Sequence, residues 1–150
     1  MPWYTDGPYT TKKFRLGSVR ADPAGNEYIF LQGVGSLAAQ DVVVYDEDFV
    51  TTRLSTSASY GPVAVALVAA DATTEYGWFG LSGEFTADAA DVADNAEVYA
   101  TATAGRIDDA ADNDHKITGM VFRSTDNSSA ASATVQIRRG GAFHTHDLST

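Results

Sequence analysis

Short apolar runs separated by turn-forming residues are the feature that most constrains how this chain folds. The runs are rich in β-branched and aromatic residues and are bounded by Gly, Asp, Asn and Ser; examples are residues 28–31, 42–45, 62–68 and 76–81. No stretch keeps a 3.6-residue apolar period over three turns. The pattern predicts an all-β fold, in which residues 86–96, rich in Asp and Ala, form a loop with at most one helical turn.

The pattern occurs twice along the chain. Residues 66–83 form a predicted hairpin that closes on a glycine, and residues 119–140 form a second hairpin of similar length that also closes on a glycine. A similar unit precedes each hairpin, starting with residues 42–45 in the first half and residues 97–100 in the second. Two units are too few for a solenoid, so they indicate one compact barrel or sandwich built from a duplicated β unit.

The chain of 150 residues has the length of one domain. We predict an extended N-terminal arm over residues 1–22, because four aromatic residues there are interrupted by two prolines and two glycines. The β domain is expected over residues 23–143, with pseudo-repeats over about 25–83 and 84–140. Residues 144–150 are expected to form a C-terminal tail.

Charge and cysteine content exclude several classes of function. The chain has 20 Asp and Glu against 10 Lys and Arg, a net charge of −10, so it would repel phosphate and we expect no nucleic-acid partner. Cys is absent, which excludes disulfides, a thiol nucleophile and Cys-ligated zinc. No apolar run approaches the ~18 residues of a membrane span, and residues 1–20 lack an apolar signal core, so we expect no membrane partner.

Positive charge gathers near the N-terminus of this acidic chain, where Lys12, Lys13, Arg15 and Arg20 lie among the aromatic residues of the arm. A basic arm on an acidic body favours docking onto an acidic surface, which could belong to a second copy of the chain. The aromatic residues either anchor such an interface, where Trp and Tyr dominate, or pack on the arm's own body. The candidate interface residues are Trp3, Tyr4, Tyr9, Lys12, Lys13, Phe14 and Arg15.

Two motifs carry metal-ligand chemistry. On a strand, His144 and His146 would lie on one face, as a metal requires, but they lie near the C-terminus, where chains fray. Residues 108–114 offer several carboxylates but lack the Gly and the final Glu of an EF-hand calcium loop. We therefore assign no metal site and no cofactor, and both motifs stay open as cation sites.

The sequence contains no convincing catalytic arrangement. A Ser-His-Asp triad would need His115, His144 or His146 as its base, and the chain has no Gly-x-Ser-x-Gly turn; the stretch around Ser82 falls one residue short of that pattern. Glu84 and Asp88 could act as paired carboxylates, but such pairs arise easily in a chain with 20 acidic residues. We predict that the protein is not an enzyme, and we name no catalytic residue.

The second half of the chain contains a series of motifs shared with a known family. They are YGWFGLSG at 76–83, EVYATATAGRIDDA at 97–110, KITGMVF at 116–122 and ATVQI at 133–137. These motifs resemble those of the head decoration, or capsid cement, proteins of tailed bacteriophages. The resemblance implies a non-enzymatic virion protein that binds the outer surface of the capsid at capsomer junctions and stabilises the shell. It also implies the major capsid protein as partner, and self-association, commonly as a homotrimer.

Three alternatives remain. One is another structural role in the phage, such as the base of a head fibre. A second is a small hydrolase that would use the Asp-rich loop and a metal ion. The third is a glycan- or surface-binding β module, which would expose aromatic residues on one sheet face. Tyr60, Tyr76, Trp78 and Tyr99 are the candidates for such a face. Their alternation with apolar residues favours packing in the core instead.

Overall fold

The computed structural model describes residues 2–126 and 131–146. Strands hold 45% of the chain and helix 2%, which confirms the predicted all-β class. The elements in chain order are the 3-10 helix η1 (Trp3–Thr5) and the strands β1 (Val19–Ala21), β2 (Glu27–Gln32), β3 (Val42–Tyr45), β4 (Thr51–Arg53), β5 (Gly61–Ala66), β6 (Tyr76–Ala89), β7 (Glu97–Ala100), β8 (Ile107–Asp108), β9 (Lys116–Phe122), β10 (Ala131–Ile137) and β11 (Ala142–Thr145). Among the described residues, no helix has the length and apolar character that crossing a membrane requires.

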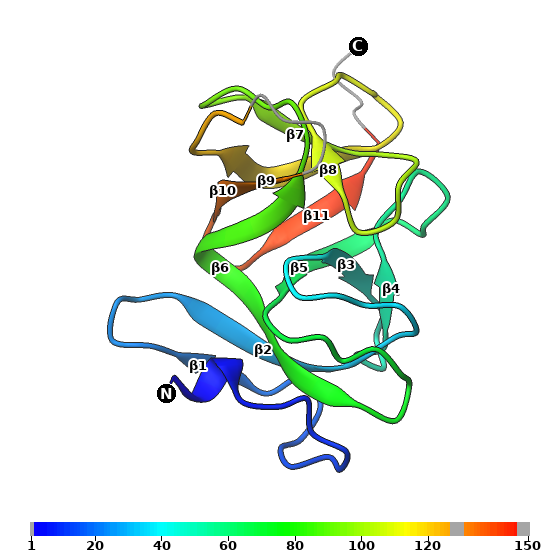
Figure 1. The fold of residues 1–150 in the computed structure, drawn as a ribbon, viewed down its shortest axis with the longest axis vertical. Helices are drawn as coiled ribbons and strands as arrows, with labels where there is room; N and C mark the ends of the chain where they lie inside the picture. The colour runs from blue at the N-terminus through cyan, green and yellow to red at the C-terminus, as the bar shows by residue number, and fades with distance from the viewer. Residues whose placement is uncertain (1, 127–130, 147–150) are drawn as a thin grey trace.

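Six strands close a barrel (Figure 1). The pairings run β6–β8–β7–β9–β11–β5, and β5 pairs with β6 to complete the ring. Every strand of this ring contributes to one large hydrophobic cluster, which includes the buried Val63, Ile107 and Ile117. Closing a sheet on itself pairs its edges, so the ring needs no edge protection of its own.

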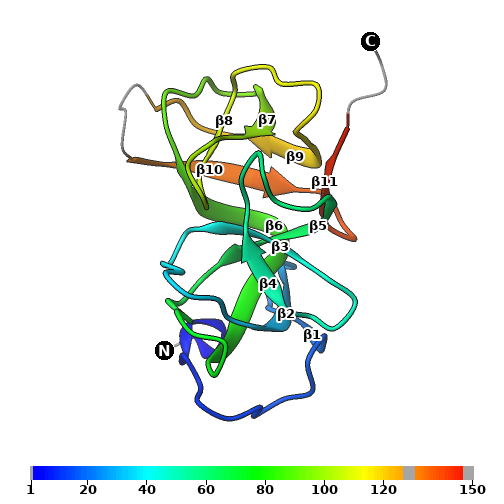
Figure 2. The ribbon, with the colours of Figure 1, turned by 90° about the vertical axis from the view of Figure 1, so that its right-hand side faces the viewer.

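The same five pairings occur twice, as the predicted duplication requires. In the first unit β2 pairs with β6, β6 with β5, β5 with β3 and β3 with β4, and a parallel bridge from Val50 to Gln32 returns to β2. In the second unit β6 pairs with β10, β10 with β9, β9 with β7 and β7 with β8, and a parallel pairing of Ile107 with Ala89 returns to β6. Figure 2 shows the first unit below the second, and β11 joins them by pairing with both β5 and β9.

Strand β6 belongs to both units. Its first half pairs with β2 as far as Ser82, and its second half pairs with β10 from Gly83 onward. The φ of Gly83 is 111°, and a Cβ there would lie 2.1 Å from the Asn26 side chain. Glycine is therefore required where the strand passes from one unit to the next.

Two predicted boundaries differ from the structure. β6 continues to Ala89, so the loop predicted over residues 86–96 begins only after that residue. The alanines at alternate positions of this stretch are buried in the barrel, where packing offsets their weak preference for strands. At the C-terminal end, β11 includes His144, so the predicted boundary between body and tail falls inside a strand.

Candidate functional site

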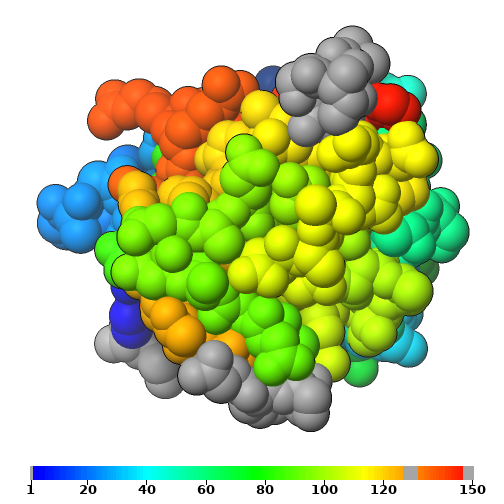
Figure 3. Space-filling view, turned by 90° about the horizontal axis from the view of Figure 1, so that it is seen from above, coloured from blue at the N-terminus to red at the C-terminus, as the bar shows by residue number. Residues whose placement is uncertain are grey.

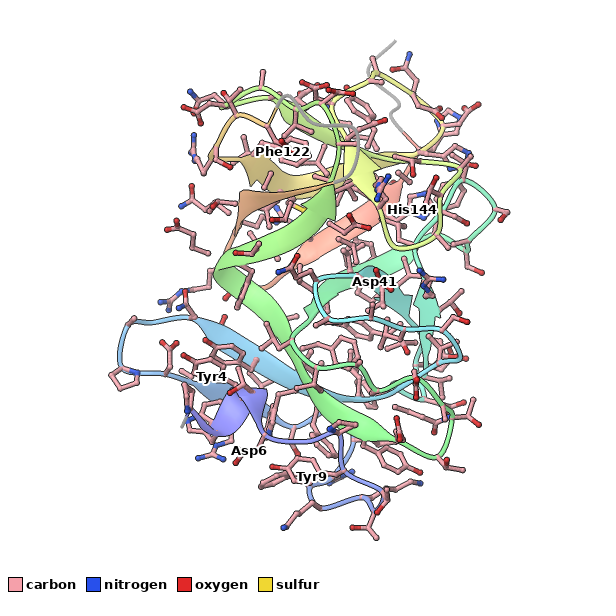
Figure 4. All side chains as sticks on the ribbon, viewed as in Figure 1. Tyr4, Asp6, Tyr9, Asp41, Phe122 and His144 are labelled. Carbon is pink, nitrogen blue, oxygen red and sulfur yellow. The ribbon has the colours of Figure 1, made fainter. Side chains whose placement is uncertain are left out.

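Aromatic residues hold the N-terminal arm against the first unit. Tyr4 stacks on Tyr28 of β2, with ring centroids 4.4 Å apart and planes inclined by 7°. Trp3 meets Trp78 of β6 edge to face at 5.1 Å, and the Arg20 guanidinium lies 4.3 Å from the centre of the Trp3 ring. Figure 4 shows Tyr4 beside β2 in the lower part of the molecule. These contacts bury apolar surface and add aromatic and cation–π attraction.

A second anchor lies farther along the arm. The backbone of Tyr9 exchanges two hydrogen bonds with Tyr76, the first residue of β6, at 2.8 and 2.9 Å. The Phe14 ring packs on Phe30, with centroids 5.3 Å apart. The arm is thus fixed by backbone pairing as well as by its side chains.

The basic residues of the arm stay in solvent. Lys12, Lys13 and Arg15 are exposed, and in the described part of the chain none of them forms an ion pair. The Lys13 ammonium lies 5.4 Å from the centre of the Tyr9 ring. The structure therefore separates the predicted interface residues: the four aromatic ones lie half-buried on their own body, and the three cations face outward.

A hollow of ≈ 580 Å³ opens beside the hairpin of β3 and β4. Its walls include three aromatic residues, Tyr45, Phe49 and Tyr60, and the first two stack with centroids 6.4 Å apart. Asp46 and Glu47 add two carboxylates. None of the described residues that line it is Lys, Arg, Asn or Gln. We call this feature the acidic hollow.

The turn after β3 shapes one wall of the acidic hollow. The Asp46 carboxylate accepts hydrogen bonds from the backbone N–H groups of Asp48 and Val50, at 3.0 and 3.1 Å. These bonds hold Phe49 at a φ of 61°, a left-handed conformation that a bulky residue rarely adopts. Gly17 of the arm packs against the Phe49 ring so closely that a Cβ there would lie 2.5 Å from it. The arm and the acidic hollow therefore share Phe49.

A pair of histidines packs beside Tyr60 and Ser59, two residues that line the acidic hollow. His144 is fully buried, and its Nδ1 donates a hydrogen bond to the Ser59 carbonyl at 2.9 Å. Its Nε2 is left to accept from Nδ1 of His115, 3.2 Å away, and the Tyr60 ring lies 5.0 Å from the His144 ring. Burial lowers the pKa of His144, an effect that the bond to Ser59 opposes, so the neutral imidazole is favoured.

The two histidines of the His-x-His motif do not converge. His146 lies beyond β11 and is exposed, with Nε2 2.7 Å from the Asp114 carboxylate. His144, labelled in Figure 4, is buried on β11 and meets the half-buried His115 instead. In the described part of the chain, no group of three or more His, Asp or Glu could hold a metal ion. Although His144 lies near the end of the chain, burial and its hydrogen bonds anchor it, so the expected fraying does not apply to this residue.

Two of the four carboxylates in residues 108–114 stabilise turns of their own loop, while Asp109 accepts the N–H of Ala93 and Asp114 lies beside His146. Asp108 accepts the N–H of Ala110 at 3.1 Å, and Asp112 accepts the N–H of Asp114 at 3.1 Å. Burial raises the pKa of Asp108, and the bond from Ala110 opposes the rise. Seen from above, segments of the second unit coloured green to yellow cover most of this end of the molecule (Figure 3). Turn formation accounts for Asp108 and Asp112 in this Asp-rich run.

The catalytic candidates are engaged in other contacts. The Ser82 hydroxyl donates to the Glu27 carboxylate at 2.6 Å. Glu84 is exposed, whereas Asp88 pairs with Arg106 at 3.4 Å. Four residues along a strand separate Glu84 from Asp88 by about 13 Å. A glycosidase pair lies within about 5 to 9.5 Å, so these two carboxylates do not form one.

Most aromatic candidates for a glycan-binding face are buried. Trp78 and Tyr99 are 0% and 5% exposed, which confirms the expectation of core packing for both. Tyr76 is half-buried under Tyr9, and only Tyr60 is open, at 54%. A continuous aromatic face is therefore not formed by these four residues.

Two parts of the site could not be predicted from the sequence. The acidic hollow forms where Tyr60, from one loop, lies beside the turn that follows Tyr45. The one sequence feature that pointed to it was the acidic run 46–48 between Tyr45 and Phe49. The contact of His115 with His144 depends on the pairing of β9 with β11. A comparison of the chain with known protein-family models and with curated proteins finds no match. The function therefore has to be argued from the arm and the acidic hollow.

Proposed function

We propose that this protein is a decoration, or cement, protein of a tailed-bacteriophage head. It binds the outer surface of the capsid at capsomer junctions and stabilises the shell. The observation that carries the proposal is the arm, whose aromatic residues fix it on the barrel while Lys12, Lys13 and Arg15 remain exposed. A basic segment held in place on an acidic body is suited to docking onto an acidic protein surface. The resemblance of residues 76–140 supports the phage setting.

The proposed partners are the major capsid protein and further copies of this chain, for which the resemblance favours a trimer. Many copies on one particle reinforce each other, so a modest affinity at each site is sufficient. A net charge of −10 would keep decorated particles apart. The proposed role is binding without catalysis, and the engagement of Ser82 and Asp88 in other contacts supports it.

Co-sedimentation with capsids tests this function. The purified chain is mixed with undecorated particles assembled from the neighbouring major capsid protein, and the bound copies are counted. Saturation at a number that fits the capsid symmetry is expected. A clean failure to bind would overturn the proposal, and binding at a few copies only would favour a head-fibre base or another structural role.

A matched pair of charge reversals locates the contact. Lys12→Glu is expected to weaken particle binding about tenfold, a change of ~1.4 kcal/mol in binding free energy. Arg139→Glu reverses another exposed cation and gives the same net charge, so it should leave binding unchanged. Deleting residues 1–13 is a poorer test, because it removes aromatic packing from Tyr28 and Trp78 as well.

A glycan-binding module is the second candidate function. The exposed Tyr60 in the acidic hollow is the observation that favours it, since sugars stack on aromatic rings beside polar groups. A glycan array separates the two candidates. Binding that is lost in Tyr60→Ala, together with no binding to capsids, would replace the decoration proposal with this one.

A further inference from the structure

We infer that the acidic hollow of one copy receives the basic segment of the arm, residues 12–15, from a second copy. The inference rests on the proposed role of the arm in docking, and it names an acceptor for the arm. It assigns a use to the acidic hollow, which the proposed capsid contact leaves without one.

Charge complementarity identifies the occupant. The acidic hollow presents Asp46 and Glu47, and in the described part of the chain neither forms an ion pair. Lys12, Lys13 and Arg15 are likewise without ion pairs there. One chain therefore carries two exposed groups of opposite charge that do not satisfy each other. Contact between copies would satisfy both.

The chemistry of the walls also suits a cation. Tyr45, Phe49 and Tyr60 offer ring faces, and ammonium or guanidinium groups are attracted to such faces beside carboxylates. Lys13 already lies over an aromatic ring of its own arm, that of Tyr9. None of the described residues that line the acidic hollow is Lys or Arg, so its carboxylates have no cation of their own there.

The shapes of the two surfaces fit a contact of this kind. Figure 2 shows the arm forming the lowest loop of the molecule, extended away from the barrel, and the acidic hollow is concave. Gly17 against Phe49 fixes the end of the arm relative to its own hollow. Because a convex patch meets a different, concave patch, two copies can exchange arms reciprocally as a symmetric dimer, or further copies can join head to tail into a ring or a chain.

Charge-swap variants test the inference by sedimentation of the full-length protein over a range of concentrations. The wild type is expected to self-associate, and Glu47→Lys and Lys12→Glu should each weaken association about tenfold or more. Mixing the two variants should restore association, because each then offers a complementary surface to the other. Asp48→Lys is the matched control: it makes the same charge change in the same turn but does not line the acidic hollow, so association should be unchanged.

Three results would overturn the inference. The wild type could stay monomeric up to about 1 mM, which would mean a dissociation constant weaker than about 1 mM, or less than ~4 kcal/mol of binding free energy. Glu47→Lys and Asp48→Lys could behave alike, or the mixture could fail to recover. Capsid binding distinguishes this failure from failure of the proposed function: if Lys12→Glu loses capsid binding while self-association is absent, the arm docks on the shell and not on another copy. Thermal unfolding of each variant checks that it folds, and recovery in the mixture would itself demonstrate folding.

Discussion

The two β units share a set of pairings but differ in the pair that occupies one equivalent position. Two residues before the parallel bridge of the first unit, Phe30 pairs with Trp78. Two residues before the corresponding parallel pairing of the second unit, Ala87 pairs with Ala133. All four side chains are buried. The same backbone position thus holds a large aromatic pair in one unit and a pair of methyl groups in the other.

The opposite faces of the two sheets differ as well. The neighbouring pair in the first unit is Ile29 with Phe79, both buried in a second apolar cluster. Its counterpart in the second unit is Thr86 with Thr134, of which Thr86 is exposed. The first unit is therefore covered on both faces, by the arm on one and by the second cluster on the other. In the second unit, the face of β6 and β10 that carries Thr86 and Thr134 is open to solvent at Thr86.

This difference is visible in the sequence of the two strands. A strand buried on both faces is a continuous apolar run, as residues 28–31 are, whereas a strand with one solvated face alternates, as residues 85–89 do. The two units share their pairings, and the arm packs on the first. The arm is therefore part of the first unit's core, and it carries its basic residues outward from there.

The largest expected effect comes from removing the aromatic pair's larger member. Trp78→Ala should lower the free energy of unfolding by about 3 to 5 kcal/mol, because the ring is fully buried and both Trp3 of the arm and Phe30 of β2 pack on it. Denaturant titration measures the change. Trp78→Phe is the control: the indole Nε1 is buried and, among the described groups, without a hydrogen-bond partner, so Phe loses packing but no hydrogen bond. A loss below ~1 kcal/mol for Trp78→Ala would contradict the two-faced burial of this unit.

The second prediction concerns the opposite end of the molecule, where ionisation matters. Because burial lowers the pKa of His144, the unfolded chain binds a proton near the ordinary value of about 6.5 that the folded chain does not. The contribution of neutral His144 to stability is therefore fully present above that pH. It is lost as the pH falls from there toward the lower pKa of His144 in the folded chain. The free energy of unfolding of the wild type, measured from about pH 7.5 down to about pH 5, should show this fall.

His144→Gln separates this effect from the general response to acid. The variant keeps a side-chain N–H for the Ser59 carbonyl and cannot titrate, so its stability should change less with pH even if it is lower throughout. His146→Gln changes an exposed imidazole and should retain the fall. Parallel curves for the wild type and His144→Gln would remove His144 as the cause.

The features that could be predicted from the sequence are those set by local pattern. The all-β class, the hairpins of β5 with β6 and of β9 with β10, and the pairing of β3 with β4 follow from short apolar runs and turn residues. The continuation of β6 to Ala89 could not be predicted, because alanine gains its place in a strand only from the barrel that covers it.

The candidate site was predictable in its parts and not in its arrangement. Composition identifies the arm residues, but it does not decide whether Trp3 and Tyr4 anchor an interface or pack on their own body. The structure shows them packed on Trp78 and Tyr28. The burial of His144 and the position of Tyr60 depend on contacts between segments far apart in sequence. The pairing of strands that are distant in sequence decides where His144 and Tyr60 lie, and the turn residues of the sequence do not predict that pairing.

The smallest expected effect tests how the arm is held on the first unit. Arg20 lies over Trp3 at 4.3 Å and near Trp78 at 5.8 Å, and it is exposed, so the cation–π attraction is worth about 0.5 to 1 kcal/mol. Arg20→Met keeps an apolar chain over the rings and removes the charge, and denaturant titration should show a loss in that range. Arg15→Met makes the same change of net charge at an exposed arm position, where no ring contact is recorded among the described residues, and should cost less. Equal losses in the two variants would mean that overall charge, and not the rings of Trp3 and Trp78, accounts for the effect. The arm would then be held by aromatic packing and by the backbone pairing of Tyr9 with Tyr76, without a cation–π contribution.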